Sequence, residues 1–337
     1  MKIRLTQHSA RAYERDPERR HFDEVMNRLG GASRVGSSFW KGARLCPRET
    51  GLTLAGVGRE GFLRGRVALD MGLVFHHALE RYYESMMTQQ AEIDATGTGG
   101  AFGVPTYHEY CVAPTIAAEQ AAWESIQLFE SEPGYEDIFT TVQRMLSSYF
   151  EFYRSRDRFR ILGVEETFDL LGPGFEYSAR LDTIVEDMEH GGMWILEHKS
   201  ATSATEDLLG GYQMDMQTLG QVWLLKQQDL RGLPHFKGVL VNIATKGKVT
   251  ELHRVPVCPS ADHLKMFERS MQQLNTTLNI WEDMGWPQHL GNCTGGGRYF
   301  STCQFFDICH SFPLASVEQV AEAPPFGFTS DQTRETD

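Results

Sequence analysis

Three neighbouring segments rich in β-branched and aromatic residues constrain the fold of this chain more than any other feature. They are ILGVEETFDL (161–170), FEYSARLDTIVED (175–187) and GMWILEHK (192–199). A Gly-Pro-Gly run separates the first two segments, and a His-Gly-Gly run separates the second from the third. Short strand-like segments divided by such turn residues predict an antiparallel meander.

The patterns on both sides of this meander predict an α/β fold. Apolar residues at helical spacing precede it, whereas helical and strand patterns alternate after it. The expected elements are helices at about 68–87, 114–129 and 135–156, a helix at about 209–228, strands at 236–246 and 249–257, and a helix at about 261–284. This order predicts a mixed central sheet flanked by helices, with a helical insertion.

The same patterns divide the chain into five parts. These are a polar arm (1–35), a helical region with a short N-terminal element (36–160), the core sheet (161–257), a C-terminal helix with a cysteine-rich segment (258–312), and a tail (313–337). The tail is acidic, and we expect it to be disordered.

Composition narrows the classes of protein that this chain can represent. The chain has 337 residues, 41% of them hydrophobic, and a formal net charge of −13. That charge argues against a protein that coats nucleic acid non-specifically, because such binding depends on Lys and Arg contacts to phosphate. The first 20 residues lack an apolar segment, and no stretch is apolar enough to span a bilayer. We therefore expect a cytoplasmic (intracellular) protein with no membrane partner.

Charged residues interrupt two of the apolar strands. Asp182 lies in the second strand of the meander, and Glu197 and Lys199 lie in the third. Because side chains alternate along a strand, Glu197 and Lys199 share one face and His198 points to the other. Two carboxylates and an ammonium group are costly to bury unless they bind something, and Mg²⁺ or Mn²⁺ favours such oxygen ligands. The alternative is a cross-strand ion pair at the edge of the sheet.

This constellation resembles the core of the PD-(D/E)XK nucleases, in their RecB-like branch, which has a restriction-endonuclease-like fold. Upstream, the helix GLVFHHALE (72–80) resembles the family's Gly-x-x-x-His-x-x-Leu-Glu motif. The resemblance implies a divalent metal held by His76, Asp182, Glu197 and the His198 carbonyl, with Asp182, Glu197 and Lys199 catalytic. Glu165 and Glu166, on the preceding strand, are further candidates for an outer ligand, and we favour Glu166.

A helix downstream resembles the family's Gln-x-x-x-Tyr motif, which contacts substrate. Gln217 matches its glutamine, whereas Gln221 occupies the position of its tyrosine. We expect substrate contacts from Gln217, Gln221 and Arg180. A row of arginines at 154, 156, 158 and 160 is either a phosphate-tracking patch or a solvated helix end.

Six cysteines occur, and three of them fall within one short segment. Cys293, Cys303 and Cys309 lack the paired spacing of a zinc ribbon. Cys46, in Cys46-Pro47-Arg48, resembles the early cysteine of family members that bind a 4Fe–4S cluster with three late cysteines. The resemblance implies such a cluster, held by Cys46, Cys293, Cys303 and Cys309. A structural Zn²⁺ site and merely buried thiols are the alternatives, and Cys111 and Cys258 are interpreted as packing cysteines.

The resemblance implies a metal-dependent DNA exonuclease or end-processing nuclease, in recombination, repair, phage DNA metabolism or CRISPR adaptation. We expect DNA with single-stranded ends as the partner. No ATP-binding motor motif occurs, so any unwinding would need a separate helicase or recombination protein. The alternative is a catalytically silent DNA-binding or scaffold subunit of a recombination complex.

Overall fold

A five-stranded mixed sheet forms the centre of the protein. The computed structural model describes residues 36–43, 46–59, 67–96, 115–130, 135–228, 230, 233–288, 303 and 305–330. The strand order is β2-β3-β4-β5-β6, with β4 and β5 parallel and the other pairs antiparallel. The strands are β2 (Phe159–Gly172), β3 (Phe175–Asp187), β4 (Met193–Ala201), β5 (Phe236–Thr245) and β6 (Leu252–Val257). The predicted meander and the predicted mixed sheet are both confirmed.

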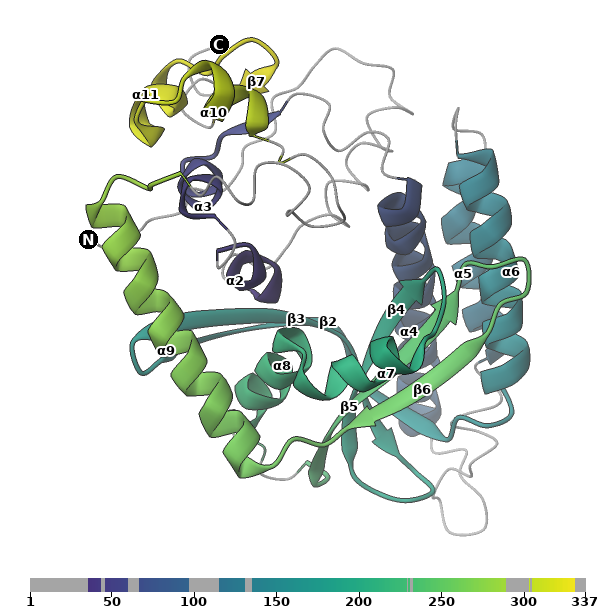
Figure 1. Ribbon diagram of the computed structural model, residues 1–337. Helices are drawn as coiled ribbons and strands as arrows, with labels where there is room; N and C mark the ends of the chain where they lie inside the picture. Colours follow the sequence, from purple (N-terminus) through teal and green to yellow (C-terminus); the bar gives the residue numbers. More distant parts are fainter. Residues whose placement is uncertain are drawn as a thin grey trace.

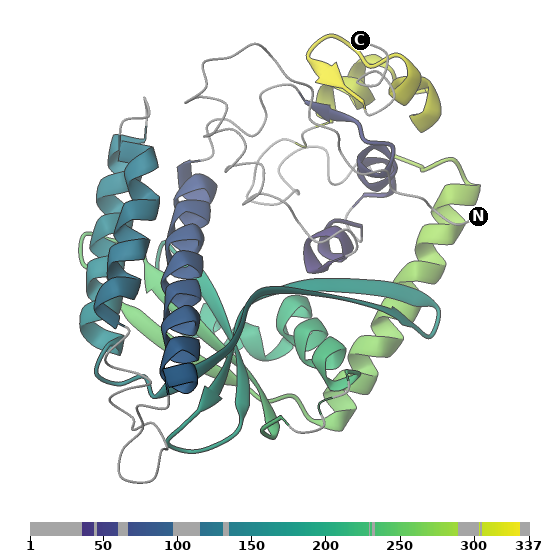
Figure 2. The same cartoon turned by 180° about the vertical axis from the view of Figure 1, so that it is seen from behind.

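Helices cover both faces of this sheet (Figure 1). On one face lie α4 (Val67–Thr96), α5 (Thr115–Glu130) and α6 (Glu136–Tyr153), and on the other lie α8 (Met216–Lys226) and α9 (Ala261–Asp283). The view from behind shows α4, α5 and α6 side by side, with the β2–β3 hairpin extending away from them towards α9 (Figure 2). Asn275 of α9 holds the hairpin tip, where its Nδ2 donates to the Gly174 carbonyl at 2.7 Å.

The helix predicted at about 209–228 is broken into three pieces. They are α7 (Glu206–Gly211), the 3-10 helix η2 (Tyr212–Met214) and α8. Asp215 has an extended backbone and caps α8 by accepting a hydrogen bond from the Gln217 N–H at 2.8 Å. An aspartate that caps a helix cannot also continue one, which explains the break. Lys41 of α2 (Ser37–Ala43) fixes this cap from outside, with its Nζ 2.6 Å from Asp215 Oδ2.

The tail predicted to be disordered is folded as far as residue 330, so that prediction is wrong for the described part. It contains α11 (Val317–Glu322) and β7 (Phe328–Thr329), and β7 pairs with β1 (Gly58–Arg59). Val317, Val320 and Ala321 are buried, and Ser316 and Gln319 form a capping box at the start of α11. The prediction from acidic composition overlooked a small apolar helix face that packs in one hydrophobic cluster with α3 (Pro47–Leu54) and α10 (Phe306–Ser311).

Among the helices that the structure describes, none combines the length and the apolar character needed to cross a bilayer.

Close packing at Gly220 fixes the position of α8 on the sheet. A Cβ atom at Gly220 would lie 2.0 Å from Oη and 2.2 Å from Cζ of Tyr177, a fully buried residue of β3. We therefore expect Gly220→Ala to lower the free energy of unfolding by about 1–3 kcal/mol, because the ring cannot move aside without displacing its neighbours. Urea unfolding would measure the change.

Gly210 offers the matched control for this substitution. It is also helical, but no atom of the described residues lies within 4 Å of the Cβ that an alanine would add. Gly210→Ala should be neutral or stabilising, since alanine is the better helix former. Equal losses of stability in the two variants would show that Tyr177 does not restrict Gly220.

Candidate active site

Asp182 lies where strands β3 and β4 separate. Thr183 and Leu196 form the last pair of their ladder on this side, after which β3 follows β2 and β4 follows β5. The backbone N–H of His198, which pairs with β5 but has no partner on β3, donates to Asp182 Oδ2 at 2.7 Å. The separation of the strands thus creates a notch in the sheet, and the carboxylate of Asp182 lies in it.

Glu197, the next carboxylate, is 1% exposed and is surrounded by donors. Gln217 Nε2 donates to its Oε1 at 2.7 Å, and Gln221 Nε2 donates to its Oε2 at 2.6 Å. Lys199 Nζ also donates to Oε1. The two glutamines were predicted to contact substrate, but the structure directs both side-chain amides to Glu197. They lie one turn apart on the face of α8 that covers the sheet, and a buried carboxylate requires such donors.

The charges in the notch act strongly on one another. Burial, and then the negative charge of Glu197, raises the pKa of Asp182 well above its ordinary value. Burial alone would lower the pKa of Lys199, but the charges of Glu197 and Asp182 outweigh burial and raise it. The raised pKa favours the charged form of Lys199, which suits the ammonium group to hold negative charge.

His76 reaches the notch from helix α4. A Cβ at Gly72 would lie 3.1 Å from Ser200 Oγ, so α4 packs closely against the end of β4 at this point. His76, one turn later on the same face, lies with Nδ1 3.4 Å from Asp182 Oδ2. Burial, and then the charge of Lys199, lowers the pKa of His76 to about 4. Its imidazole is neutral at pH 7 and keeps a lone pair. His77, in contrast, lies beside Glu80, 3.2 Å away.

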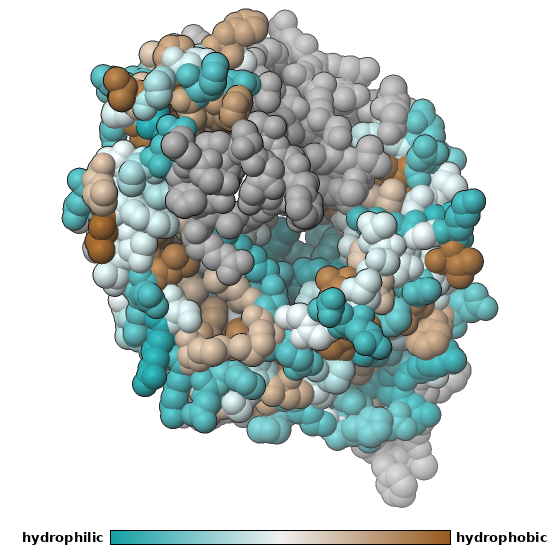
Figure 3. Space-filling model, in the orientation of Figure 1, coloured by the Kyte–Doolittle hydropathy of each residue, from teal (hydrophilic) through white to brown (hydrophobic). Residues whose placement is uncertain are grey.

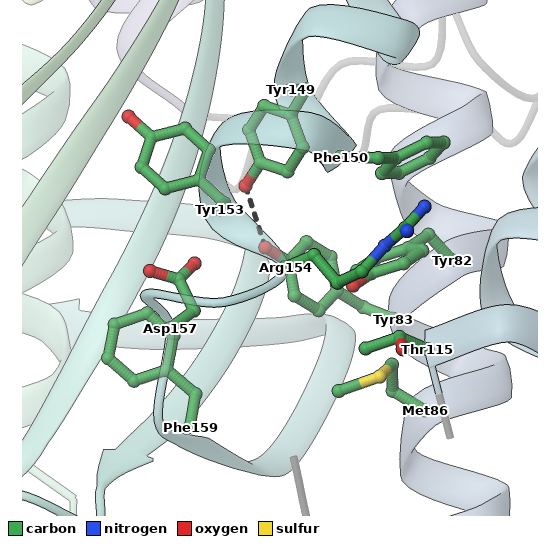
Figure 4. A pocket seen from close by; sticks show the side chains of 10 residues that line it. All are labelled: Tyr82, Tyr83, Met86, Thr115, Tyr149, Phe150, Tyr153, Arg154, Asp157 and Phe159. Carbon is green, nitrogen blue, oxygen red and sulfur yellow. Dashed lines mark hydrogen bonds between the residues drawn. The ribbon is translucent and has the colours of Figure 1, made fainter. Parts of the chain in front are cut away.

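The ring of His198 points to the opposite face of β4 from Glu197, as the alternation predicts. It stacks on Tyr83 of α4 at a centroid distance of 5.4 Å and meets Tyr149 of α6 edge-on at 5.9 Å. The hydroxyl groups of these two tyrosines are 2.7 Å apart and share a hydrogen bond, which Figure 4 shows. The aromatic pair thereby supports the backbone of the residue between Glu197 and Lys199.

A polar chain continues from this aromatic pair to the beginning of the sheet. Asn242 Nδ2 donates to Tyr149 Oη at 3.1 Å, and Arg254 Nε donates to Asn242 Oδ1 at 2.6 Å. Arg254 also binds both carboxylate oxygens of Asp157, at 2.6 and 2.9 Å. Asp157 lines a small pocket with Tyr83 and Tyr149 (Figure 4). This connected chain ties β5 and β6 to the helices behind the notch.

Glu165 lies opposite Asp182 on β2, because Val164 pairs with Thr183 and Glu166 pairs with Leu181. Its φ of 53° is unusual for a residue other than glycine, and such strained backbone is concentrated at functional sites. The charge of Glu165 contributes to the raised pKa of Asp182. Glu166, the residue favoured by the sequence, is exposed.

Arg180 has an acidic neighbour at the edge of the site. Its Nε lies 2.7 Å from Glu165 Oε2, and its side chain is 35% exposed. Arg180 is therefore accessible to a ligand, but a ligand must compete with Glu165 for its guanidinium.

The residues of the notch fit a hard divalent cation by the chemistry of their donors. Asp182 and Glu197 are two carboxylates whose mutual repulsion a cation would relieve, and neutral His76 adds a nitrogen donor. In the described ranges, no three His, Cys, Asp or Glu side chains converge as a complete metal cage would require. Mg²⁺ does not need such a cage, because it is usually bound through one or two carboxylates together with waters and substrate phosphates.

Three of the four predicted cluster cysteines are described, but within the described residues they do not converge as a group of metal ligands. Cys46 and Cys309 are buried, and both thiols contribute, after burial and Glu49, to raising the pKa of Cys303 to about 12. Cys293 and Cys111 lie outside the described residues. Cys258 is exposed, so its interpretation as a packing cysteine is wrong. It follows strand β6, where the chain has already left the core.

Arg48 carries a buried positive charge beside these cysteines. It is 4% exposed, and its guanidinium donates to the carbonyls of Ala315 at 2.7 Å and Phe312 at 3.4 Å. Within the described part of the chain, its Nε has no hydrogen-bond partner. Its charge is therefore held by backbone carbonyls, and a buried charge without an ionic partner is costly.

The arginine row at 154–160 is engaged within the protein, which favours the solvated helix end over the phosphate-tracking patch. Its contacts are Arg154 with Glu119, Arg156 with the Phe152 carbonyl, Arg158 with Glu189 at 3.2 Å, and Arg160 with Asp94 at 3.0 Å.

The space-filling view shows a hollow at the centre of one face whose visible floor is largely hydrophilic (Figure 3).

A comparison with known protein families agrees with the fold. Residues 43–310 match the family model of the PD-(D/E)XK nuclease superfamily. Among solved structures, SSO0001 is 14% identical, with 58% of this chain and 78% of that chain covered and a TM-score of 0.30. A protein named "Putative exonuclease" from Eubacterium rectale is 10% identical, with 69% of this chain and 93% of that chain covered and a TM-score of 0.34. Both TM-scores are too low for these two likenesses to carry an argument. No curated protein matches the chain.

Proposed function

The chain belongs to the PD-(D/E)XK nuclease superfamily, and from this premise we propose that it is a Mg²⁺- or Mn²⁺-dependent deoxyribonuclease that processes DNA ends. The observation that carries the proposal is the meeting of Asp182, Glu197 and Lys199 in the notch between β3 and β4. Placing the buried Glu197 beside the partly buried Asp182 and Lys199 in one notch is costly for stability, and metal-assisted phosphodiester hydrolysis uses all three.

Each residue of the notch has a proposed role. Asp182, Glu197, His76 and the His198 carbonyl would hold the cation, which when bound lowers the pKa of a water molecule and offsets charge on phosphate oxygens. Lys199, which remains protonated, orients the attacking water and balances the charge that develops on the pentacoordinate phosphorus. Arg180 contacts the DNA backbone once it exchanges Glu165 for phosphate.

We further propose that the protein lies in the RecB-like branch and carries a 4Fe–4S cluster on Cys46, Cys293, Cys303 and Cys309. The order of the motifs along the chain supports the branch: the helix with Gly72 and His76 comes first, then the strands with Asp182, Glu197 and Lys199, and then the helix with Gln217. The electrostatic effect of Cys46 and Cys309 on Cys303, together with the buried Arg48 two residues after Cys46, supports a shared site for these cysteines. The cluster would be structural, with Zn²⁺ as the alternative metal.

The proposed partner is DNA with single-stranded ends, supplied by a separate helicase or recombination protein. The test is digestion of end-labelled single- and double-stranded DNA, with and without Mn²⁺ or Mg²⁺, by protein purified without oxygen. We expect metal-dependent cutting that Lys199→Ala loses and that the matched surface variant Lys237→Ala retains. No cutting by a protein that holds its full iron content and binds DNA would instead favour the silent scaffold subunit.

A further inference from the structure

We propose that Gln221 is a positioning residue that leaves Glu197 one free lone pair, on Oε2, for the cation. This inference rests on the proposed nuclease function and deepens it. It concerns the position at which this chain departs from the Gln-x-x-x-Tyr motif that its helix α8 resembles.

The hydrogen bonds around Glu197 determine which of its lone pairs remain. Among the described residues, Oε1 accepts from both Lys199 Nζ and Gln217 Nε2, whereas Oε2 accepts only from Gln221 Nε2, at 2.6 Å. An ionised carboxylate offers about four acceptor sites, two on each oxygen. Three of them are taken, so Glu197 can bind a cation through Oε2 alone and as a monodentate ligand.

The orientation of the Gln221 amide is set by the carboxylate that it contacts. A flipped amide would bring its carbonyl oxygen against Oε2 of Glu197, where two acceptors would repel each other. Gln221 is 1% exposed, and its own Oε1 is buried without a hydrogen-bond partner among the residues that the structure describes. That oxygen is suited to accept a hydrogen bond from a water molecule carried into the notch.

The burial of Gln221 also explains why it does not take over the substrate contact expected at this position. Gly220 brings α8 so close to Tyr177 that residue 221 is covered by the sheet. A side chain there meets Glu197 and cannot reach DNA. The exchange of tyrosine for glutamine thus converts a substrate contact into a contact to a metal ligand.

Gln221→Met tests this role, because methionine matches glutamine in length and lacks the amide. Mn²⁺ binding to the full-length protein is measured by calorimetry, and DNA binding by fluorescence anisotropy in EDTA. We expect the Mn²⁺ dissociation constant to rise about 10–100-fold, as is typical when a partner of a metal ligand is removed. DNA affinity should stay unchanged, and cleavage should recover in part at saturating Mn²⁺.

The matched control is Gln213→Met. Gln213 is exposed and donates to the Pro256 carbonyl at 2.9 Å, so the same chemical change occurs outside the notch. We expect wild-type Mn²⁺ affinity from this variant. If circular dichroism shows that Gln221→Met does not fold, Gln221→Asn replaces it, since the shorter amide cannot reach Oε2.

Two results would overturn the inference. Wild-type Mn²⁺ affinity in the folded variant would show that Gln221 does not position Glu197. Weaker DNA binding with unchanged Mn²⁺ affinity would make Gln221 a substrate contact instead. In both cases a wild-type protein that cuts DNA leaves the nuclease proposal standing, whereas a wild-type protein that neither binds Mn²⁺ nor cuts DNA removes both.

Discussion

Asp182→Asn is expected to reduce metal-dependent cleavage at least about 10³-fold, because it removes a charged ligand from the centre of the notch. The asparagine Oδ1 can still accept the His198 N–H that Asp182 Oδ2 accepts at 2.7 Å. The separation of β3 from β4 should therefore persist. Single-turnover digestion of end-labelled DNA at saturating Mn²⁺ measures the loss.

The same variant is expected to be at least as stable as the wild type when no metal is present. Burial and the charge of Glu197 raise the pKa of Asp182 in the folded protein above its value in the unfolded chain. The folded state therefore binds the proton more tightly, and wild-type stability falls as the pH rises through the interval between the two pKa values. The asparagine has no proton to lose. Urea unfolding in EDTA should thus favour the variant more at pH 8 than at pH 4.

Asp169→Asn is the control for both measurements. Asp169 lies on the same β2–β3 hairpin and is exposed, so its neutralisation changes the net charge equally without touching the notch. Cleavage by Asp182→Asn at a wild-type rate would remove this residue from the catalytic group. A clear loss of stability in EDTA would show that its carboxylate serves the fold rather than the metal.

Much of the notch could be predicted from alternation and counting along the strands. Gly172 pairs with Phe175 across the Pro173–Gly174 turn, and continuing that register places Glu165 opposite Asp182. The same counting identifies Glu165 rather than Glu166 as the acidic neighbour, so the signal was present in the sequence. The sequence of the tail also contained a signal for a helix, since Ser316 and Gln319 have the spacing of a capping box ahead of an apolar helix face.

The roles of Gln217 and Gln221 could not be predicted in this way. Their spacing indicates one helix face, but not whether that face meets DNA or the sheet. The answer depends on the contact between Gly220 and Tyr177, residues far apart in sequence whose packing no local pattern encodes. The hydrogen-bonded series from Asp157 through Arg254 to Asn242 could not be predicted from the sequence for the same reason, because it joins three segments that lie far apart along the polypeptide.

Cys46→Ser is expected to abolish iron binding and to lower the free energy of unfolding by about 5 kcal/mol. A cross-link that closes a loop of about 100 residues contributes nearly that much in the chain-entropy model, and the contribution grows slowly with loop length. The proposed cluster would join Cys46 to Cys303 and Cys309 across most of the chain. Iron analysis, visible absorption and thermal unfolding of the protein purified without oxygen measure the effects.

The local position of Cys46 makes serine a discriminating substitution. Cys46 is the N-cap residue of α3, and its side chain makes no capping hydrogen bond. Serine is a favoured N-cap, so its local effect should stabilise α3 by about 0.5–2 kcal/mol. A merely buried thiol would therefore give little net loss, whereas a lost cluster ligand would outweigh the gain several-fold. Cys258→Ser, at an exposed cysteine, should keep the iron and the stability of the wild type. If the wild-type protein contains zinc instead of iron, the cross-link stands and only its metal changes. A Cys46→Ser protein as stable as the wild type would exclude both the iron–sulfur cluster and the zinc site.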